Sequence, residues 1–296
     1  MKVSIVAEGG GMRGAYVFGV MDALWEHYGL RRVDVAAGTS ASAGTLAYFV
    51  AGHGHRDGHS VWADEVSSPH FISMRNLLRG RPIMDVDYLI DVIFKQRFPL
   101  DISAIQTSPI QFIIPIESAS TGAIEYIDVR NSSYDTFELL RATCAAPIVY
   151  NKTVALGSDQ YCDPYFNEAF PLRSPQVNGT KKIIILSKPR TYVASRDGNF
   201  GIHLCRPIIS KTVYRTMQDS GEHRESLMQE CATLEKEGDV IIAPRELYGT
   251  ALDNRKETIE SHIRRGYEDA LANAEIKKLM TTLRSGERSS FYFSRP

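Results

Sequence analysis

The sequence has few cysteines and no long apolar run. Its cysteines are spread along the chain without a Cys-x-x-Cys pair: Cys144, Cys162, Cys205 and Cys231. This spread argues against a disulfide framework and against a thiolate metal site. No apolar segment approaches the ~18 residues of a membrane span, and the first residues lack the apolar core of a signal peptide. We therefore expect a cytoplasmic protein.

An excess of charge of either sign is also missing. The chain has 34 basic and 35 acidic residues, a net charge of −1, so nothing in its charge indicates a nucleic-acid partner. A hydrophobic content of 43% is ordinary for a globular protein. The sequence shows no internal repeat, low-complexity tract or obvious linker. We expect one domain over residues 1–296, with a largely helical C-terminal extension from about residue 190.

The first fifty residues alternate strand-like and helix-like segments. KVSIVA (2–7) and VDVAAG (33–38) read as buried strands, and helices are expected over 12–28 and 42–51. A strand, a glycine turn and a helix, occurring twice in succession, predict a parallel α/β sheet. Further strands are expected over 110–119, 123–129, 181–187 and 239–243, and further helices over 134–144, 211–236 and 256–283.

The first turn, EGGGMRG, places Gly9, Gly11 and Gly14 at the spacing of a dinucleotide-binding fingerprint. That fold needs an acidic residue at the end of the second strand to hold a ribose hydroxyl. Here the second strand is followed by Thr39 and Ser40 instead. The same backbone N–H groups could stabilise an oxyanion that forms on an attacked ester. A plain strand-to-helix turn is the third interpretation, but it needs fewer glycines.

The second turn, GTSASAG, has the pattern of a nucleophile elbow. Ser40 directly follows the predicted strand, with Gly38 two residues upstream and Ser42 where a glycine is usual. A competing frame centres the elbow on Ser42, with Gly44 downstream. We favour Ser40 because an elbow must lie immediately after the strand. The alternative is a serine that only caps a buried helix.

Together, EGGGMRGAY and GTSASAG resemble the patatin-like phospholipase family, and the resemblance covers about residues 1–190. That family pairs its serine with an aspartate in an Asp-Gly-Gly/Ala motif. The matching segment is YCDPYFNEAFPL (161–172), which contains Asp163 and follows the small-residue segment RATCAAPIVY (141–150). The resemblance implies a three-layer α/β/α sandwich with a mostly parallel central sheet.

The resemblance also implies an activity, namely hydrolysis of a lipid acyl ester such as a phospholipid or lysophospholipid. By position, Ser40 becomes the nucleophile and Asp163 its general base. The segment of Gly9, Gly10, Gly11 and Arg13 becomes the oxyanion hole. No metal and no organic cofactor is implied, and the expected partner is a lipid or small ester substrate.

Two departures from the family pattern touch these residues. Ser42 replaces a glycine, and Asp163 is followed by Pro164 and Tyr165 instead of small residues. Proline removes a backbone donor and restricts the residue before it. A catalytically weakened member that acts as a binding protein is therefore an alternative.

Three further segments offer competing chemistry. GHGHRDGH (52–59) resembles a metal-binding pattern through His53, His55, Asp57 and His59, but a solvated loop after a helix is the favoured interpretation. Cys162 could be a nucleophile, although a buried thiol is the simpler interpretation. SMRNLLRGRP (73–82) presents Arg75, Arg79 and Arg81, which suit either transient contact with phospholipid headgroups or an ordinary surface helix and turn.

Overall fold

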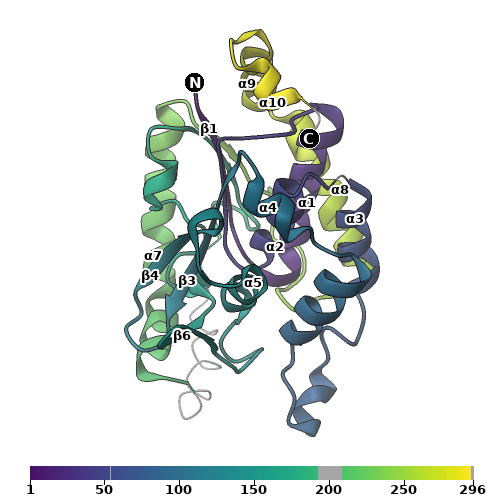
Figure 1. Ribbon diagram of the computed structural model, residues 1–296, viewed down its shortest axis with the longest axis vertical. Coiled ribbons are helices and arrows are strands. Elements are labelled where there is room, and N and C mark those ends of the chain that lie inside the picture. Colours follow the sequence, from purple (N-terminus) through teal and green to yellow (C-terminus); the bar gives the residue numbers. More distant parts are fainter. Residues whose placement is uncertain (54, 193–208, 295–296) are drawn as a thin grey trace.

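A computed structural model describes residues 1–53, 55–192 and 209–294 (Figure 1). Its strands are β1 (Val3–Ala7), β2 (Val35–Gly38), β3 (Gln111–Ser118), β4 (Ile124–Asp128), β5 (Val154–Leu156), β6 (Asp159–Cys162), β7 (Lys181–Ile185) and β8 (Val240–Ile242). In the described part of the chain they form one eight-stranded sheet in the order β5-β6-β3-β2-β1-β7-β8, with β4 beside β3. The sheet places β1 and β2, the strands before the two glycine-containing turns, side by side at its centre.

Five neighbouring strands run parallel to one another, namely β3, β2, β1, β7 and β8. Ala7, the last residue of β1, pairs with Gly38 of β2 and with Ile185 of β7. Among the described strands of the sheet, antiparallel pairing occurs at one edge, where β3 pairs with β4 and β6, and β5 with β6. The expected mostly parallel central sheet is confirmed.

The helices are interspersed along the chain. The longer ones are α1 (Gly14–Asp22), α2 (Ala41–Val50), α5 (Thr136–Cys144), α7 (Lys211–Lys236), α8 (Lys256–Ala272) and α9 (Ala274–Ser285). The short or irregular ones are η1 (Gly11–Arg13), η2 (Ala23–His27), α3 (His55–Ser60), η3 (Val61–Glu65), η4 (Met74–Arg79), η5 (Tyr88–Arg97), α4 (Ile102–Thr107), η6 (Val129–Asn131), η7 (Pro164–Phe166), η8 (Pro175–Val177) and α10 (Ser289–Phe293).

Helices cover both faces of the sheet. In Figure 1, α7 lies along one face, and α1, α2 and α8 lie on the other. Successive residues of β1 alternate between the two layers, because Ile5 and Ala7 belong to the core under α1 and α2, whereas Val6 belongs to the core under α7. The three-layer α/β/α sandwich is therefore confirmed.

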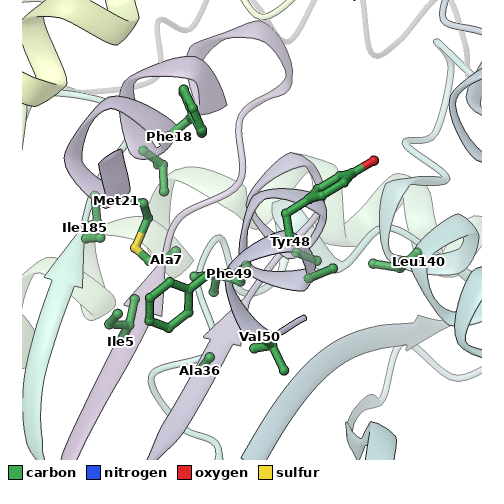
Figure 2. Packing of buried hydrophobic residues seen from close by; sticks show 14 of the residues in the cluster. Ile5, Ala7, Phe18, Met21, Ala36, Tyr48, Phe49, Val50, Leu140 and Ile185 are labelled. Carbon is green, nitrogen blue, oxygen red and sulfur yellow. The ribbon is translucent and has the colours of Figure 1, made fainter. Parts of the chain in front are cut away.

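The core between the sheet and the first two helices positions both turns. Figure 2 shows Met21 of α1 and Phe49 of α2 beside Ile5 and Ala7 of β1, whereas Phe18 of α1 points away from these strands. These side chains are almost fully removed from water. Their packing holds α1 and α2 on the central strands, after which the two turns occur.

Helix α8 crosses α1 with the two backbones in close approach. A Cβ at Gly19 would lie 2.0 Å from the Ile263 carbonyl oxygen, and one at Gly266 would lie 2.1 Å from the Tyr16 carbonyl oxygen. Only glycine fits at either position. The helix that follows the glycine turn is thus held by a segment more than 200 residues later in the sequence.

Two local expectations are refined by the structure. The helix expected over 256–283 is two helices, α8 and α9, because the Asn273 side chain caps a new start by accepting hydrogen bonds from the backbone N–H groups of Glu275 and Ile276, both at 3.0 Å. The helix expected over 134–144 begins after Asp135, whose carboxylate accepts from the Glu138 N–H at 3.1 Å.

Candidate active site

Ser40 lies at the sharp turn between β2 and α2, in a backbone conformation that L-residues rarely adopt. Its φ is 55° and its ψ is −129°. Such a conformation costs of order 1–3 kcal/mol and persists only where the surroundings impose it. The Ser40 N–H donates to Thr143 Oγ1 at 3.0 Å, which anchors the turn to α5. This is the backbone expected of a nucleophile elbow.

Small residues let the chain approach Ser40 closely. A Cβ at Gly38 would lie 2.8 Å from Leu46 Cδ1, so α2 can fold back directly over β2. A Cβ at Gly9 would lie 3.0 Å from the Ser40 Cβ. The glycine turn therefore runs directly against the serine.

The competing serine, Ser42, is fully buried. Its hydroxyl donates a hydrogen bond to the Glu8 carbonyl oxygen, just before the glycine turn. The hydroxymethyl group that replaces the usual glycine thus ties α2 to the end of β1. Because this hydroxyl is engaged and has no access to solvent, the geometry favours Ser40 over Ser42 as the reactive serine.

The backbone N–H groups of the glycine turn differ in their availability. The Gly9 N–H donates to the Ala169 carbonyl oxygen at 2.9 Å, and the Met12 N–H donates to the Ala251 carbonyl oxygen at 3.0 Å. Within residues 1–53, 55–192 and 209–294, the N–H groups of Gly10 and Gly11 have no acceptor. The oxyanion hypothesis included Gly9, but its amide is already engaged, so free donors remain only at the next two glycines.

Both of these glycines have positive φ angles and line the cavity described below. Gly10 has φ 146° and Gly11 has φ 59°. A Cβ at Gly11 would lie 2.3 Å from the Ala251 carbonyl oxygen. Arg13, the fourth residue of the expected oxyanion segment, donates its N–H to the Gly10 carbonyl oxygen at 3.4 Å, and its Nε lies 3.5 Å from the Gly249 carbonyl oxygen. Its amide is therefore also engaged, whereas its guanidinium lines the cavity described below.

Asp163 directly follows β6 and is buried. Its carboxylate caps η7 by accepting from the Tyr165 N–H at 2.9 Å. Burial raises the pKa of Asp163 to about 7, although the Ser40 hydroxyl and the Tyr165 N–H act in the opposite direction. The serine is thus close enough to stabilise the ionised carboxylate, and the carboxyl can change its protonation state near neutral pH.

Pro164 does not disturb this contact. It occupies the first position of η7, where a backbone N–H would have no intrahelical acceptor. Asp163 has φ −64° and ψ 122°, the extended conformation that a following proline requires. The Asp-Pro departure from the family pattern is accommodated because the proline starts a helical turn.

A cavity of about 350 Å³ joins these residues. It is lined by Gly10, Gly11, Arg13, Ser40, Met84, Ala146, Pro147, Val149, Asp163, Tyr165, Phe166, Asn167, Ala169, Lys188, Tyr192, Ser220, His223, Arg224, Ala251 and Leu252. The structure thus brings Ser40, Asp163 and the two free glycine amides around one space large enough for part of a substrate.

The sequence did not single out a buried ion cluster behind the glycine turn. Glu8 is fully buried, forms an ion pair with Arg224 and lies 3.7 Å from Lys188 Nζ. Its Oε2 also accepts from the backbone N–H of Ser187 at 2.7 Å. Glu8 and Arg224 are 216 residues apart, and the helical pattern around Arg224 reads only as polar. An acidic residue at the end of a buried strand was the one available signal.

A second buried acid, Glu117, was also missed. It pairs across the sheet with Cys162, the residue before Asp163. Its Oε1 accepts from Thr216 at 3.3 Å, and within the described part of the chain its buried Oε2 has no partner. Burial raises the pKa of Glu117 to about 7, and the nearby charge of Asp163 adds to the rise. Glu117 lies in β3, a largely apolar strand, and nothing in the sequence indicates that it lies near Asp163.

The structure gives less support to the hypotheses of a histidine metal site and of a cysteine nucleophile. His53 Nδ1 lies 3.0 Å from Asp57 Oδ2, one turn along the chain, while the side chain of His55 lies outside the described part. Among the described residues, no group of three or more His, Cys, Asp or Glu side chains could hold a metal ion. The Cys162 thiol is buried, and burial raises its pKa, which disfavours a thiolate.

The arginine-rich segment forms part of the surface. Arg75 and Arg79 of η4 are exposed, as is Arg81, and Met74 beside them is 62% exposed. None of the helices in the described ranges is both long enough and apolar enough to cross a bilayer.

The cysteines do not form disulfides among the described residues. Cys144, Cys162 and Cys231 are free thiols, and Cys205 lies outside the described residues.

Comparison with known proteins identifies a family and a similar fold. A profile of the patatin-like phospholipase family matches residues 5–175. The uncharacterized protein YjjU of Escherichia coli (strain K12) is 24% identical over 62% of this chain, which spans about half (51%) of that protein. The structure of VipD from Legionella pneumophila aligns with 94% of this chain and 67% of its own, with a TM-score of 0.53 and 12% identity. This structural likeness concerns the fold alone.

Proposed function

The chain belongs to the patatin-like phospholipase family, and on this premise we propose that it is a serine esterase that hydrolyses lipid acyl esters. One observation carries the proposal: Ser40, whose hydroxyl stabilises the ionised form of the buried Asp163, lines one cavity with that carboxyl and with two free backbone amides. Family membership supports lipid acyl hydrolysis in general. The dyad, the oxyanion hole and the substrate class are our assignments.

In the proposed mechanism, Ser40 Oγ attacks the ester carbonyl carbon while Asp163 accepts the hydroxyl proton. The alcohol then leaves, taking up that proton, and the acyl group stays on Ser40. A water molecule attacks this acyl-enzyme, Asp163 accepts its proton, and the fatty acid is released as Ser40 is restored. A pKa of about 7 suits a group that must accept and return a proton near neutral pH.

The developing negative charge needs preorganised donors. The N–H groups of Gly10 and Gly11 fill this role in our proposal because they have no other acceptor in the described structure. Arg13 contributes positive charge from the cavity lining. Gly9 contributes by its small size, which lets the turn pass within contact distance of Ser40.

An apolar acyl group has a place close to the dyad. A smaller cavity of about 70 Å³ has Met12 and Ala41 in its wall, the residues that follow Gly11 and Ser40. The rest of its lining is largely aromatic and aliphatic, including Phe18, Trp62 and Phe94. This lining supports a lipid substrate over a polar ester. Transient contact with a membrane surface and a cytoplasmic location complete the proposal, which involves no nucleic acid, metal or cofactor.

The alternative is a weakened member of the family that binds lipid without hydrolysing it. This alternative is based on two departures from the family pattern, namely Ser42 and Pro164. Both are accommodated here, since Ser42 bonds to the Glu8 carbonyl and Pro164 begins η7. We therefore favour the active enzyme.

A fluorophosphonate probe tests the proposal because it reacts with a serine that is activated beside an oxyanion hole. We expect labelling at Ser40, with loss of both labelling and p-nitrophenyl butyrate hydrolysis in Ser40→Ala. Ser42→Ala is the matched control, and it should retain labelling. Removal of a serine nucleophile costs on the order of 10⁶ in kcat in a well-studied protease. Labelling of Ser42, or an active Ser40→Ala variant, would refute the assignment.

The dinucleotide interpretation of the glycine turn has its own test. Titration with NADH, NADPH or FAD, followed by fluorescence, should show no saturable binding. The second strand is followed by Ser40 and not by an acidic residue, so no carboxylate is placed there to bind a ribose hydroxyl. A micromolar Kd would reopen this interpretation.

A further inference from the structure

The cavity beside Ser40 carries cationic groups that the dyad chemistry does not use. Lys188, three residues after the end of β7, and Arg224, on α7, line it together with Arg13. Lys188 and Arg224 are each only 6% exposed. Among the described lining residues, Asp163 is the one carboxylate. A nearly buried cluster of this sign needs a counter-charge.

The protein supplies only part of that counter-charge. Glu8, behind the cavity, forms an ion pair with Arg224 and lies 3.7 Å from Lys188 Nζ. One carboxylate thus faces two cations, and the charge of Arg13 is close enough to act on Lys188 as well. Burial lowers the pKa of Lys188 to about 8, and the charges of Arg224 and Arg13 lower it further, against the effect of Glu8. The cluster has a surplus of positive charge.

Hydrogen-bond donors are also left over. The Nε of Arg224 is buried and has no partner in the described structure, although its other nitrogens bind Glu8 and the Pro189 carbonyl oxygen. Lys188 Nζ carries three N–H groups, and its distance of 3.7 Å to Glu8 is longer than a good hydrogen bond. This ammonium lies over two aromatic rings, 4.9 Å from the centroid of Tyr165 and 4.5 Å from that of Tyr192.

We propose that Lys188 and Arg224 bind the phosphate of an anionic acyl-ester substrate, while its ester carbonyl lies at Ser40. The site then favours an acylated glycerol phosphate whose phosphate charge is not neutralised by an ammonium group of its own. A zwitterionic headgroup brings a cation next to Lys188, Arg224 and Arg13, and among the described lining residues the one carboxylate, Asp163, is already assigned to the dyad. This inference rests on the proposed esterase function and names its substrate class.

Three substrates with the same hexanoyl chain separate the effects: 1-hexanoyl-glycerol 3-phosphate, its phosphocholine counterpart and 1-hexanoylglycerol. We expect kcat/KM to be highest for the phosphate. In Lys188→Met, the ratio of kcat/KM between the phosphate and the neutral ester should fall at least tenfold. Lys278→Met, at a side chain 78% exposed, is the matched control and should leave the ratio unchanged. An unchanged ratio in Lys188→Met, or a preference for the neutral or zwitterionic ester, would overturn the proposal.

Binding to the Ser40→Ala variant separates this inference from catalysis. By calorimetry, glycerol 3-phosphate should bind and glycerol should not, and Lys188→Met in the same background should abolish the signal. If Lys188→Met does not fold, Lys188→Arg should retain binding. Hydrolysis of neutral ester without phosphate binding would refute the subsite and leave the esterase intact. Binding of inorganic phosphate without any substrate preference would also refute it, since the anion would then not belong to the ester.

Discussion

The carboxyl groups of Glu117 and Asp163 are buried neighbours. Glu117 pairs across β3 and β6 with Cys162, the residue that precedes Asp163, and the charge of Asp163 raises the pKa of Glu117. Each carboxyl has a pKa of about 7, mainly because burial disfavours the charged form. The two groups therefore titrate as a coupled pair in the same pH range.

The coupling predicts how activity depends on pH. Asp163 must be ionised to accept the serine proton, so kcat/KM for p-nitrophenyl butyrate should rise with pH through an apparent pKa near 7 and then level off. Glu117→Gln removes a neighbouring negative charge, which should move this limb to lower pH. The Gln side chain can still accept the Thr216 hydrogen bond. A limb that stays in place or moves to higher pH would exclude coupling between the two groups.

A second prediction concerns stability. The pKa of Asp163 is raised from an ordinary value of 3.8 to about 7 in the folded protein, so the folded state binds more protons between these pH values. Its free energy of unfolding must then fall as pH rises across that window. Asp163→Asn should lack this contribution. Urea unfolding should show the variant to be more stable than wild type at pH 8, by on the order of a few kcal/mol, and the gain should vanish at pH 4. The same variant should be inactive.

The backbone of Ser40 predicts a difference between two inactive variants. Its φ of 55° and ψ of −129° are unfavourable for serine and alanine but open to glycine. Ser40→Gly should therefore unfold at a higher denaturant concentration than Ser40→Ala, by about 1–2 kcal/mol in free energy of unfolding. Equal stability would mean that the turn is not strained in solution.

The glycine turn gives a further prediction. A Cβ in Gly11→Ala would lie 2.3 Å from the Ala251 carbonyl oxygen, so either the loop or the Gly11 amide must move. Loss of one oxyanion donor costs about 10²–10³ in kcat, and we expect a loss of about 10² in fluorophosphonate labelling rate. Gly221→Ala on α7 is the control. A Cβ there meets nothing within 4 Å, so full activity is expected. Normal labelling of Gly11→Ala would remove this residue from the proposed hole.

Local chemistry explains which features could be predicted from the sequence. Ser40 and the glycine turn each follow a short apolar strand, and two parallel strands end at the same edge of a sheet, so their proximity follows from topology. Asp163 follows β6, which belongs to the antiparallel part of the sheet, and its place near Ser40 could be expected only through the family motif. Its hydrogen bond with Tyr165 could not be expected, because it depends on η7 starting at a proline.

Long-range pairing explains what the sequence left out. Glu8 meets Arg224 from the opposite end of the chain, and nothing in the polar pattern of α7 distinguishes this arginine from its neighbours. The break at Asn273 is different, because its signal was present. Asparagine is a favoured helix cap, but the apolar period continues from α8 into α9 and masks the interruption.

The extent of the family match and the extent of the sheet do not coincide. The match ends at residue 175, whereas β7, the neighbour of β1 on the side away from β2, begins at Lys181. A chain cut at residue 175 would leave β1 as an open edge, which invites aggregation. It would also leave the buried Glu8 carboxylate without its ion-pair partner, Arg224. In this chain, the segment that the family profile matches is therefore shorter than the segment that completes the sheet and pairs the buried Glu8.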